Sequence, residues 1–476
     1  MLLCPLGGQH CNMTSKSRTV GELYSLREVT RHVTASLSGR MARRIAACVG
    51  VWMLGAAAAQ AATITAGSCS ESAVAAAIAS AARGDTVVVP DGSCTWTTGI
   101  AINGKGIVLQ GASANGVRIT NNATYGISVT EDTIFHTEIK QFVVNGSGTF
   151  ILMRPHASPN DDGKAILIHH LAFVDTRGIR AEANRGVIYL NTVDGSNTLN
   201  ANLEFVQCKP LSLTNSWRTP STMGTNDTTG ESNLYVEDNT FTKVLQSVMD
   251  FDDNCRMVIR RNTFTNSATG SHGADTSSVG GRHFEMYDNT FVFSNYGDCT
   301  GTQTMNVPFF YFLRGGTGVI ADNVGFQNMS SCAWGNKPAL NMTVMNLQRN
   351  AGPNACWGAG TSGGARYPAP RQIGRGYVTG TGVDGMGRTN DAFTYVGDSE
   401  PLYIWNQNVT PALSDYGSND CSSPDSTSNY IKAGRDYILG VKPGYAKYQY
   451  PHPLRSGSGG GSAGTPAAPT NLRITS

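Results

Sequence analysis

The sequence has little charge: charged residues make up 15% of its 476 residues, and the formal net charge is only +2. This excludes a nucleic-acid-binding surface spread over the whole molecule, because such a surface needs a large excess of basic residues. The absence of any Cys-x-x-Cys pair argues against a structural zinc site. No helical pattern of any length interrupts the short apolar runs between Thr86 and Phe326. With 55 glycines for tight turns, the composition predicts a secreted β protein.

The longest apolar run, Ile45–Ala59, is shorter than the roughly 20 residues that a membrane span needs. It follows the basic start Met41-Ala-Arg-Arg and ends in Ala59-Gln-Ala61, which is the pattern of a secretory signal peptide over residues 41–61. We therefore expect cleavage after Ala61 and a secreted protein, extracellular or periplasmic, with no membrane attachment. Residues 1–40 are mostly polar, and we interpret them as a mis-annotated upstream extension. The alternative is a signal anchor with a cytoplasmic tail.

The stretch Leu234–Ser294 holds three near-copies of one unit: Leu234–Phe241, Met257–Phe264 and Phe284–Phe291. Each copy ends in Asn-Thr-Phe. The asparagines of successive copies lie 23 and then 27 residues apart. Such a period is typical of a solenoid, and the alternation of apolar and polar residues within a copy predicts a strand. Because Asn tolerates the left-handed conformation, we expect each Asn to turn a corner between two strands and the three to stack in a ladder.

These copies resemble the coils of right-handed parallel β-helix proteins of the pectate-lyase-like superfamily, in particular secreted bacterial members. The resemblance implies an all-β fold, a right-handed parallel β-helix over residues 62–455. An Ala-rich stretch, Ser70–Arg83, predicts a short N-terminal capping helix with Ser70 as its N-cap. Tyr448–Leu454 resembles the closing segment of such proteins. We interpret residues 456–465 as a Gly/Ser linker and residues 466–476 as the truncated start of a fibronectin type III-like module.

Eight cysteines follow the signal peptide, an even number that favours disulfide bonds in an exported protein. We expect Cys69–Cys94 first, since these residues bracket the predicted helix and first strand. We also expect Cys208–Cys255, whose members lie about two coils apart.

Positions that alternate with the inward-facing Val236, Ile259 and Met286 are predicted to face solvent on the outer wall of the coils. They are Tyr235, Glu237, Val258, Arg260, Glu285 and Tyr287, with His283 in the same register. Around them, many of the few charged residues gather between Asp250 and Glu285. The candidates fall into three groups. The candidate catalytic residues are Arg260, His272, Arg282 and His283; the candidate substrate-binding residues are Arg256, Glu285 and Tyr287; the candidate metal ligands are Asp250, Asp252 and Asp253.

We predict a polysaccharide lyase that cleaves a uronic-acid-containing glycan by β-elimination. The reaction removes a weakly acidic proton next to a carboxylate, so the site must neutralise that carboxylate, which calcium bound by carboxylates does in many superfamily members. An Arg or His then accepts the proton. The expected partner is an acidic polysaccharide, with no nucleic acid, and the protein is expected to be a monomer.

Two other functions remain open at this point. Asp252-Asp253 and His272-Gly273 resemble elements of polygalacturonase-type glycoside hydrolases, although the other elements of that family have no counterpart here. A non-catalytic glycan-binding protein or adhesin is the third possibility, because a fold does not determine a function. The same residues also fit structural roles: Asp252-Asp253-Asn254 as a turn, the arginines as partners of Glu237 and Glu285 in exposed ion pairs.

Overall fold

The chain divides into two compact units, Met1–Gln60 and Ala61–Ser476, and the computed structural model describes residues of the second. The description covers residues 61–456 except 157–162, 184, 196–203, 209–228, 245–246, 252–254, 268, 272–280, 295–310, 314, 329–372, 375–398 and 411–432. The predicted upstream extension, signal peptide, linker and C-terminal module lie outside the described residues, apart from Ala61 and Ser456. Within the described part, no helix is long and apolar enough to cross a membrane.

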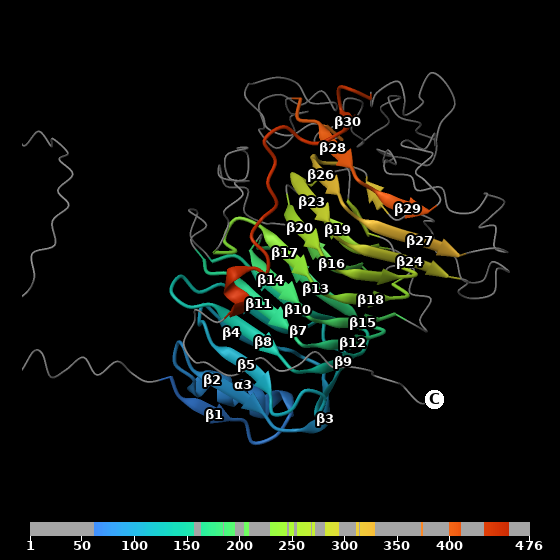
Figure 1. The fold of residues 1–476 in the computed structure, drawn as a ribbon. Coiled ribbons are helices and arrows are strands. Elements are labelled where there is room, and N and C mark those ends of the chain that lie inside the picture. The colour runs from blue at the N-terminus through green and yellow to red at the C-terminus, as the bar shows by residue number, and fades with distance from the viewer. Residues whose placement is uncertain are drawn as a thin grey trace, which may run out of the picture. The chain divides into compact units, whose positions relative to one another are not determined.

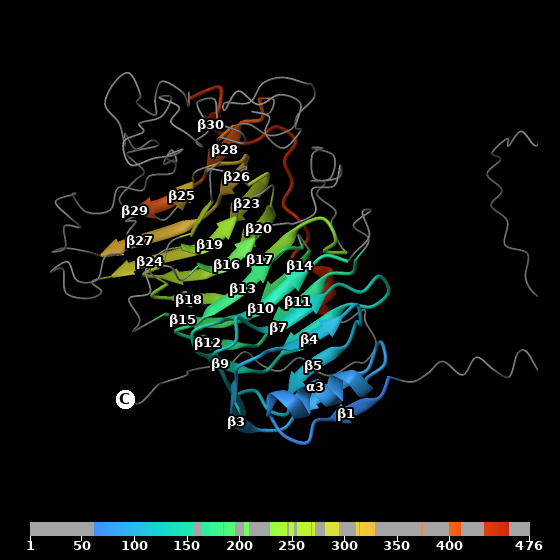
Figure 2. The ribbon, with the colours of Figure 1, turned by 180° about the vertical axis from the view of Figure 1, so that it is seen from behind.

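Three parallel sheets, here called A, B and C, contain all of the described strands (Figure 1, Figure 2). In spatial order, sheet A contains β1 (Thr63–Thr65), β2 (Thr86–Val89), β5 (Val108–Gly111), β8 (Thr137–Lys140), β11 (Ile166–His169), β14 (Gly186–Tyr189), β17 (Leu234–Glu237), β20 (Arg256–Arg260), β23 (His283–Tyr287), β26 (Gly318–Ala321), β28 (Leu402–Trp405) and β30 (Tyr437–Leu439). Sheet B contains β3 (Gly92–Trp96), β6 (Val117–Asn121), β9 (Val143–Asn145), β12 (Ala172–Val174), β15 (Thr192–Asp194), β18 (Thr240–Thr242), β21 (Thr263–Thr265), β24 (Thr290–Ser294), β27 (Val324–Asn328) and β29 (Asn408–Thr410). Sheet C contains β4 (Ile100–Asn103), β7 (Tyr125–Thr130), β10 (Thr149–Arg154), β13 (Arg177–Ala181), β16 (Glu204–Cys208), β19 (Ser247–Phe251), β22 (Thr269–Ser271) and β25 (Tyr311–Leu313).

The chain visits the sheets in the order C, A, B, so three consecutive strands make one coil, as in β19, β20 and β21. Each strand pairs in parallel with the equivalent strand one coil away. Val236 therefore lies beside Ile259, and Ile259 beside Met286. This is a right-handed parallel β-helix, and the fold predicted from the repeats is confirmed.

The interior of the coils is one continuous apolar core that includes Val236, Ile259 and Met286, as the alternation predicted. The repeated phenylalanines of sheet B are stacked in it. The ring centroids of Phe241 and Phe264 lie 5.1 Å apart, and those of Phe264 and Phe291 lie 4.6 Å apart. Aromatic stacking of this kind adds to area burial, so the identical residue in successive coils stabilises the stack.

The predicted asparagine ladder is present and longer than the three repeats suggested. It runs through buried Asn191, Asn239, Asn262, Asn289 and Asn323, and Asn323 donates to the side chain of Gln407. From Asn239 onward, each side-chain oxygen accepts two hydrogen bonds from the preceding asparagine, one from its backbone N–H and one from its amide group. Asn239, for example, donates both to Oδ1 of Asn262 at 3.0 Å.

The residue that turns the corner is different from the one predicted. The left-handed conformation belongs to the residue before each asparagine: Asp238 has φ 57°, Arg261 has φ 55° and Asp288 has φ 57°. The asparagine itself follows the corner and points inward. The prediction was wrong in this detail because the asparagine side chain points inward to form the ladder, so the preceding residue, which is not buried, adopts the left-handed backbone.

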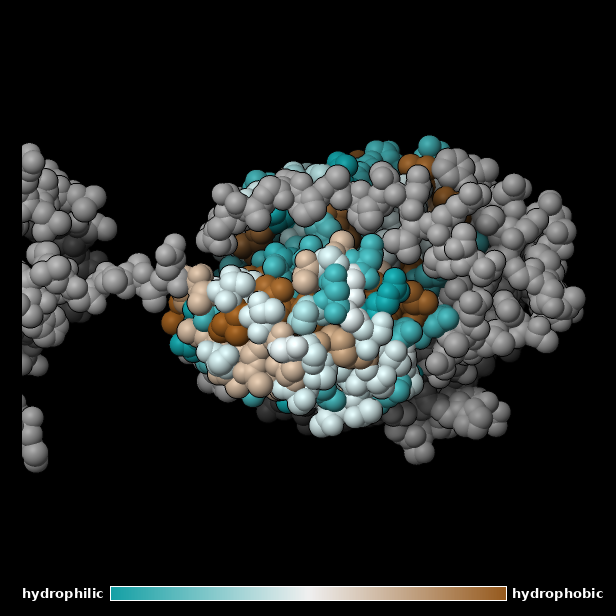
Figure 3. All heavy atoms as spheres, turned by 90° about the horizontal axis from the view of Figure 1, so that it is seen from below, coloured by the Kyte–Doolittle hydropathy of each residue, from teal (hydrophilic) through white to brown (hydrophobic). Residues whose placement is uncertain are grey.

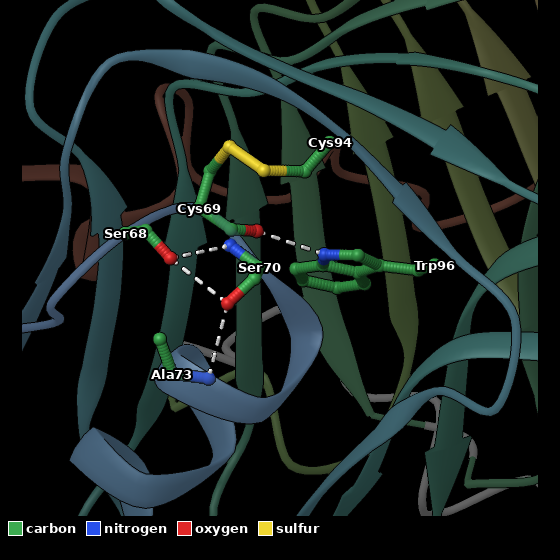
Figure 4. Close-up of a disulfide and its surroundings, with 6 residues drawn as sticks. All are labelled: Ser68, Cys69, Ser70, Ala73, Cys94 and Trp96. Carbon is green, nitrogen blue, oxygen red and sulfur yellow. Dashed lines mark hydrogen bonds between the residues drawn. A yellow bond between two sulfur atoms is a disulfide. The ribbon is translucent and has the colours of Figure 1, made fainter.

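Helix α3 (Glu71–Ser80) precedes the first full coil, and its residues Val74, Ala77 and Ile78 belong to the same core as the coils. Ser70 is the N-cap, as predicted, and its side chain accepts a hydrogen bond from the N–H of Ala73 at 3.4 Å. The surface at this end consists mostly of residues of intermediate hydropathy (Figure 3). Both predicted disulfides are present. Cys69–Cys94 joins the start of the helix to β3 (Figure 4), and Cys208–Cys255 joins β16 to the residue before β20.

Candidate functional site

The outer face of sheet A is covered by a segment that we call the C-terminal strap, residues 441–456. After β30 the strap runs back along this face and ends in the 3-10 helix η3 (Pro453–Ser456), drawn in red in Figure 1. Its Tyr448 ring packs edge-on against Tyr235 of β17, and its Arg455 lies over the ring of Tyr189 of β14. Together with residues of sheet A, Tyr448 forms an apolar cluster separate from the core.

Arg260, a predicted catalytic residue, is fully buried beneath the strap. Its three nitrogens make four hydrogen bonds: Nε donates to Glu237 at 2.7 Å, and the Nη atoms donate to the hydroxyl of Tyr287 at 3.1 Å and to the carbonyls of Tyr448 and Gln449 at 2.9 and 2.8 Å. Nη2 also forms an ion pair with Glu237 at 2.6 Å. A guanidinium bonded in this way holds the strap in place and has no lone pair with which to accept a proton.

Glu237 and its neighbours complete this anchorage. Arg455 of the strap pairs with Glu237 at 2.7 Å and also bonds Asp238. The hydroxyl of Tyr450 donates to Asp238 at 2.8 Å. The prediction that Glu237, Arg260 and Tyr287 face solvent was therefore wrong: the alternation places them on the outside of the coil, but the strap buries them there.

Further along sheet A, five charged or titratable side chains gather where sheet C turns into sheet A. We call them the corner cluster: Arg256, Arg282, His283, Glu285 and Glu400. Nη1 of Arg282 lies 2.9 Å from Oε2 of Glu400, and the ring nitrogens of His283 lie 3.5 Å from Glu285 and 3.9 Å from Glu400. Arg256 lies beside His283 in the adjacent strand.

Arg282 and His283 are buried, yet none of their side-chain nitrogens has a hydrogen-bond partner with proper geometry among the described residues. The 2.9 Å contact of Arg282 with Glu400 is thus an ion pair that lacks the directionality of a hydrogen bond. Unsatisfied buried donors cost about 1 to 3 kcal/mol each, and more when they are charged. The corner cluster therefore has donors in place for an acceptor such as a carboxylate.

Burial also sets the protonation states here. It lowers the pKa of His283 well below its ordinary value, so the imidazole is neutral. It raises the pKa of Glu285 to about 7, against the opposing effect of a hydrogen bond from Tyr445. With Glu285 largely neutral below this pH, Glu400 is the carboxylate that pairs with Arg282. The Arg282 guanidinium therefore already faces a carboxylate, an arrangement that suits an anionic ligand.

The predicted metal ligands are only partly described. Asp250 lies on the outer face of sheet C, next to Gln207 in the adjacent strand, and is buried. Asp252, Asp253 and the predicted catalytic residue His272 lie outside the described residues. In the part of the chain that the structure describes, no three His, Cys, Asp or Glu residues come together as metal ligands would.

A second polar group on sheet A was missed from the sequence. Oε1 of Glu138 lies 2.9 Å from Nε2 of His169 and 2.5 Å from Nζ of Lys140, and the Nδ1 atoms of His169 and His170 are 2.5 Å apart. Burial raises the pKa of Glu138, but His169 and Lys140 outweigh it and lower the value to about 2. Burial, with His169 and Lys140, lowers the pKa of His170 to about 4. The His169-His170 pair at the end of an apolar strand was the available signal.

An open polar face lies on sheet C. Arg180 bonds Glu182 at 2.9 Å, and Arg154 lies 3.9 Å from the same carboxylate. Arg154 is about half exposed, with 52% of its side chain accessible. Asp250 lies two strands further along the same column, beyond Gln207. The half-exposed Arg154 is the group on this face that is accessible to an anionic ligand.

No family model matches the chain, and no curated protein matches it. Among solved structures, the chain is similar to an alginate lyase from Paenibacillus sp. str. FPU-7 (13% identity, TM-score 0.33, covering 65% of this chain and 97% of that one). It is also similar to the PL6 family polysaccharide lyase Pedsa3628 from Pseudopedobacter saltans (13% identity, TM-score 0.37, 79% and 91% covered) and to the PL6 family alginate lyase AlyGC (10% identity, TM-score 0.33, 75% and 53% covered). At these values the fold assignment rests on the strand pairing described above.

Proposed function

We propose that this protein is a polysaccharide lyase that cleaves a uronic-acid-containing glycan by β-elimination at the corner cluster. One observation carries the proposal: a buried guanidinium and a buried neutral imidazole, adjacent in the chain, make no hydrogen bond of proper geometry with the described residues, and the guanidinium has only its ion pair with Glu400 among them. A uronate fits both groups, since its carboxylate accepts from Arg282 and its neighbouring C–H bond faces the His283 ring.

Each step of the elimination has a candidate residue. Arg282, with Arg256 beside it, neutralises the uronate carboxylate and so stabilises the negative charge that develops next to it. A ring nitrogen of neutral His283 accepts the proton from C5. The electron pair of the C5–H bond forms the C4–C5 double bond, the C4–O bond breaks, and the departing sugar oxygen takes up a proton from solvent; His283 later releases the C5 proton to solvent.

Glu400 pairs with Arg282 at the position where the substrate carboxylate is proposed to bind. It is the more accessible of the two carboxylates of the cluster, with 22% of its side chain accessible, and it occupies the position at Arg282 that a ligand carboxylate would take. A uronate therefore competes with Glu400 for the guanidinium. Glu400→Gln weakens this competition, and we expect it to lower KM for the acidic glycan.

Calcium belongs to the proposal only as a requirement to be tested. Of the proposed ligands Asp250, Asp252 and Asp253, the structure describes Asp250 alone, and no cluster of three ligands occurs in the described ranges. We derive no step of the reaction through the metal. Activity measured after dialysis against a chelator, with and without added Ca²⁺, tests this requirement.

The test of the function is direct. The purified protein is incubated with pectate, alginate and glucuronan, and the ultraviolet absorbance of the unsaturated product is followed. We expect absorbance with at least one polymer and its loss in Arg282→Ala and His283→Ala. The control is Arg83→Ala, which removes a half-exposed arginine paired with Asp132 in the first coils, far from the cluster, and should keep full activity.

Other results refute the proposal in distinct ways. New reducing ends without ultraviolet absorbance would indicate the alternative, a glycoside hydrolase. Retention of a labelled acidic glycan without any cleavage would indicate a binding protein or adhesin. Full activity in both the Arg282 and His283 variants would place the reaction elsewhere, with the Arg154 and Arg180 face of sheet C as the next place to test.

We also infer that the protein acts outside the cell. The inference rests on the signal-peptide pattern of residues 41–61. Expression of the whole chain in a bacterial host, followed by N-terminal sequencing of the exported protein, should give a first residue of Ala62. A protein retained in the cytoplasm with residues 1–61 attached would contradict it.

A further inference from the structure

The C-terminal strap reaches the corner cluster through one residue. The hydroxyl of Tyr445 donates a hydrogen bond of 2.8 Å to Oε2 of Glu285, although the two residues are 160 positions apart in the chain. The other carboxylate oxygen of Glu285 faces Nε2 of His283 at 3.5 Å. Tyr445, Glu285 and His283 thus form a row in which the strap residue is at one end and the proposed base is at the other.

The surroundings explain why Glu285 is sensitive to its neighbours. In sheet A it lies between Val258 and Val319, both fully buried, so apolar side chains flank it on both adjacent strands. The ionised carboxylate is disfavoured in such a place, and the few polar groups around it decide its charge. Tyr445 and Lys442 of the strap, and Arg260 beneath it, all favour the ionised form.

We propose that Glu285 and Tyr445 are positioning residues for His283, so that the C-terminal strap is part of the site as well as the cover of sheet A. This rests on the proposed function, in which His283 accepts the proton. Ionised Glu285 stabilises the imidazolium that forms, as a carboxylate does beside a catalytic histidine. Tyr445 holds the carboxylate toward His283 and helps to keep it ionised.

Proton transfer in the elimination changes the charge of His283. The C5 proton moves to His283, which gains a positive charge among Arg256, Arg282 and Lys442, all of which oppose it. Among the described residues, Glu285 and Glu400 are the carboxylates within 4 Å of the ring nitrogens of His283. Because Glu400 is the carboxylate that the substrate displaces from Arg282, Glu285 is the one left to stabilise the imidazolium. The base therefore works when Glu285 is ionised and weakens when Glu285 takes up a proton.

The proposal predicts that kcat rises with pH. The pKa of Glu285 is raised to about 7, so kcat should rise with pH through an apparent pKa near that value. Glu285→Gln removes the titrating group, and we expect its kcat to fall by about 100-fold and to lose this rise. KM should change little, since Arg282 still binds the carboxylate. Tyr445→Phe removes a hydrogen bond to the ionised form and should shift the rise to higher pH.

The conservative and control variants separate positioning from a loss of structure. Glu285→Asp keeps the charge and should restore part of kcat together with the pH dependence. Lys447→Ala removes the ion pairs of the strap with Asp288 and Asp322 and leaves the hydrogen bond of Tyr445 to Glu285 in place. It should keep the wild-type pH profile. If Lys447→Ala changes the profile as Tyr445→Phe does, the strap acts only through its fit, and the inference is refuted.

A second measurement does not need activity. In protein with ¹⁵N-labelled histidine, the ring signals of His283, assigned by their loss in His283→Gln, are followed over pH. We expect a shift near the pKa of Glu285 in the wild type, its absence in Glu285→Gln, and its displacement to higher pH in Tyr445→Phe. An active lyase without these effects refutes the inference and leaves the proposed function standing. The reverse result, coupled titration in a protein that cleaves no glycan, refutes the proposed function alone.

Discussion

Substitution of one asparagine in the middle of the ladder should destabilise the protein by a predictable amount. The side chain of Asn262 makes four hydrogen bonds, all buried. It donates to Asn289 and to the carbonyl of Val236, and it accepts from the amide group and the backbone N–H of Asn239. Asn262→Ala removes all four. At about 1 kcal/mol each, the loss of unfolding free energy is about 4 kcal/mol.

Urea unfolding followed by circular dichroism measures this loss, and Asn122→Ala, at an exposed asparagine, is the matched control. Amide hydrogen exchange gives a sharper readout. The N–H of Asn239 loses its acceptor in the variant, whereas the N–H of residue 262 keeps Oδ1 of Asn289 at 3.0 Å. We expect faster exchange at residue 239 than at residue 262. A loss below about 1 kcal/mol, with both amides still protected, would show that the ladder contributes little beyond the strand pairing.

Three further predictions concern the strap, a disulfide and pH. Arg260→Met leaves the buried carboxylate of Glu237 with Arg455 as its only remaining cation among the described residues, and should lower the unfolding free energy by about 3 to 5 kcal/mol in urea. Replacement of Cys208 and Cys255 by serine opens a link between residues 47 positions apart, and should cost on the order of 4 kcal/mol, seen as a lower Tm under non-reducing conditions. Because burial raises the pKa of Glu285 from 4.5 to about 7, the folded protein binds the proton more tightly. Stability should therefore fall by up to about 3 kcal/mol as pH rises from 4.5 through 7, and urea titrations of Glu285→Gln should lack this dependence.

The repeats carried most of the information about the fold. Phe241, Phe264 and Phe291 recur in the same place of each copy because each packs on the equivalent residue of the next coil. Where equivalent positions of successive coils contact each other, the same residue type tends to recur. Such a repeat is visible in a single sequence. The first coils lack them: Phe142 and Leu171 stand where later coils have the ladder asparagine, so only strand periodicity marked this region.

The site was harder to predict because its residues come from distant parts of the chain. Arg256, Arg282, His283 and Glu285 were identified from their register, and the structure brings them into one corner. Glu400 and Tyr445 complete that corner from more than 100 positions away, and neither belongs to a repeat. A contact that occurs once in the structure produces no repeated pattern in the sequence. It can be identified only from the three-dimensional structure.

The exposure of the outer face could have been questioned from the sequence itself. In sheet A the outward column runs through Tyr235, Val258, Glu285 and Val319, and the next column includes Tyr287. Two tyrosines and two valines on adjacent strands make an apolar surface that soluble proteins usually cover. The same column contains a glutamate, which solvent or a polar partner must satisfy once the surface is covered. An apolar outer column that contains an acidic residue therefore indicates a covering segment with a hydrogen-bond donor, which is the part that Tyr445 takes in this protein.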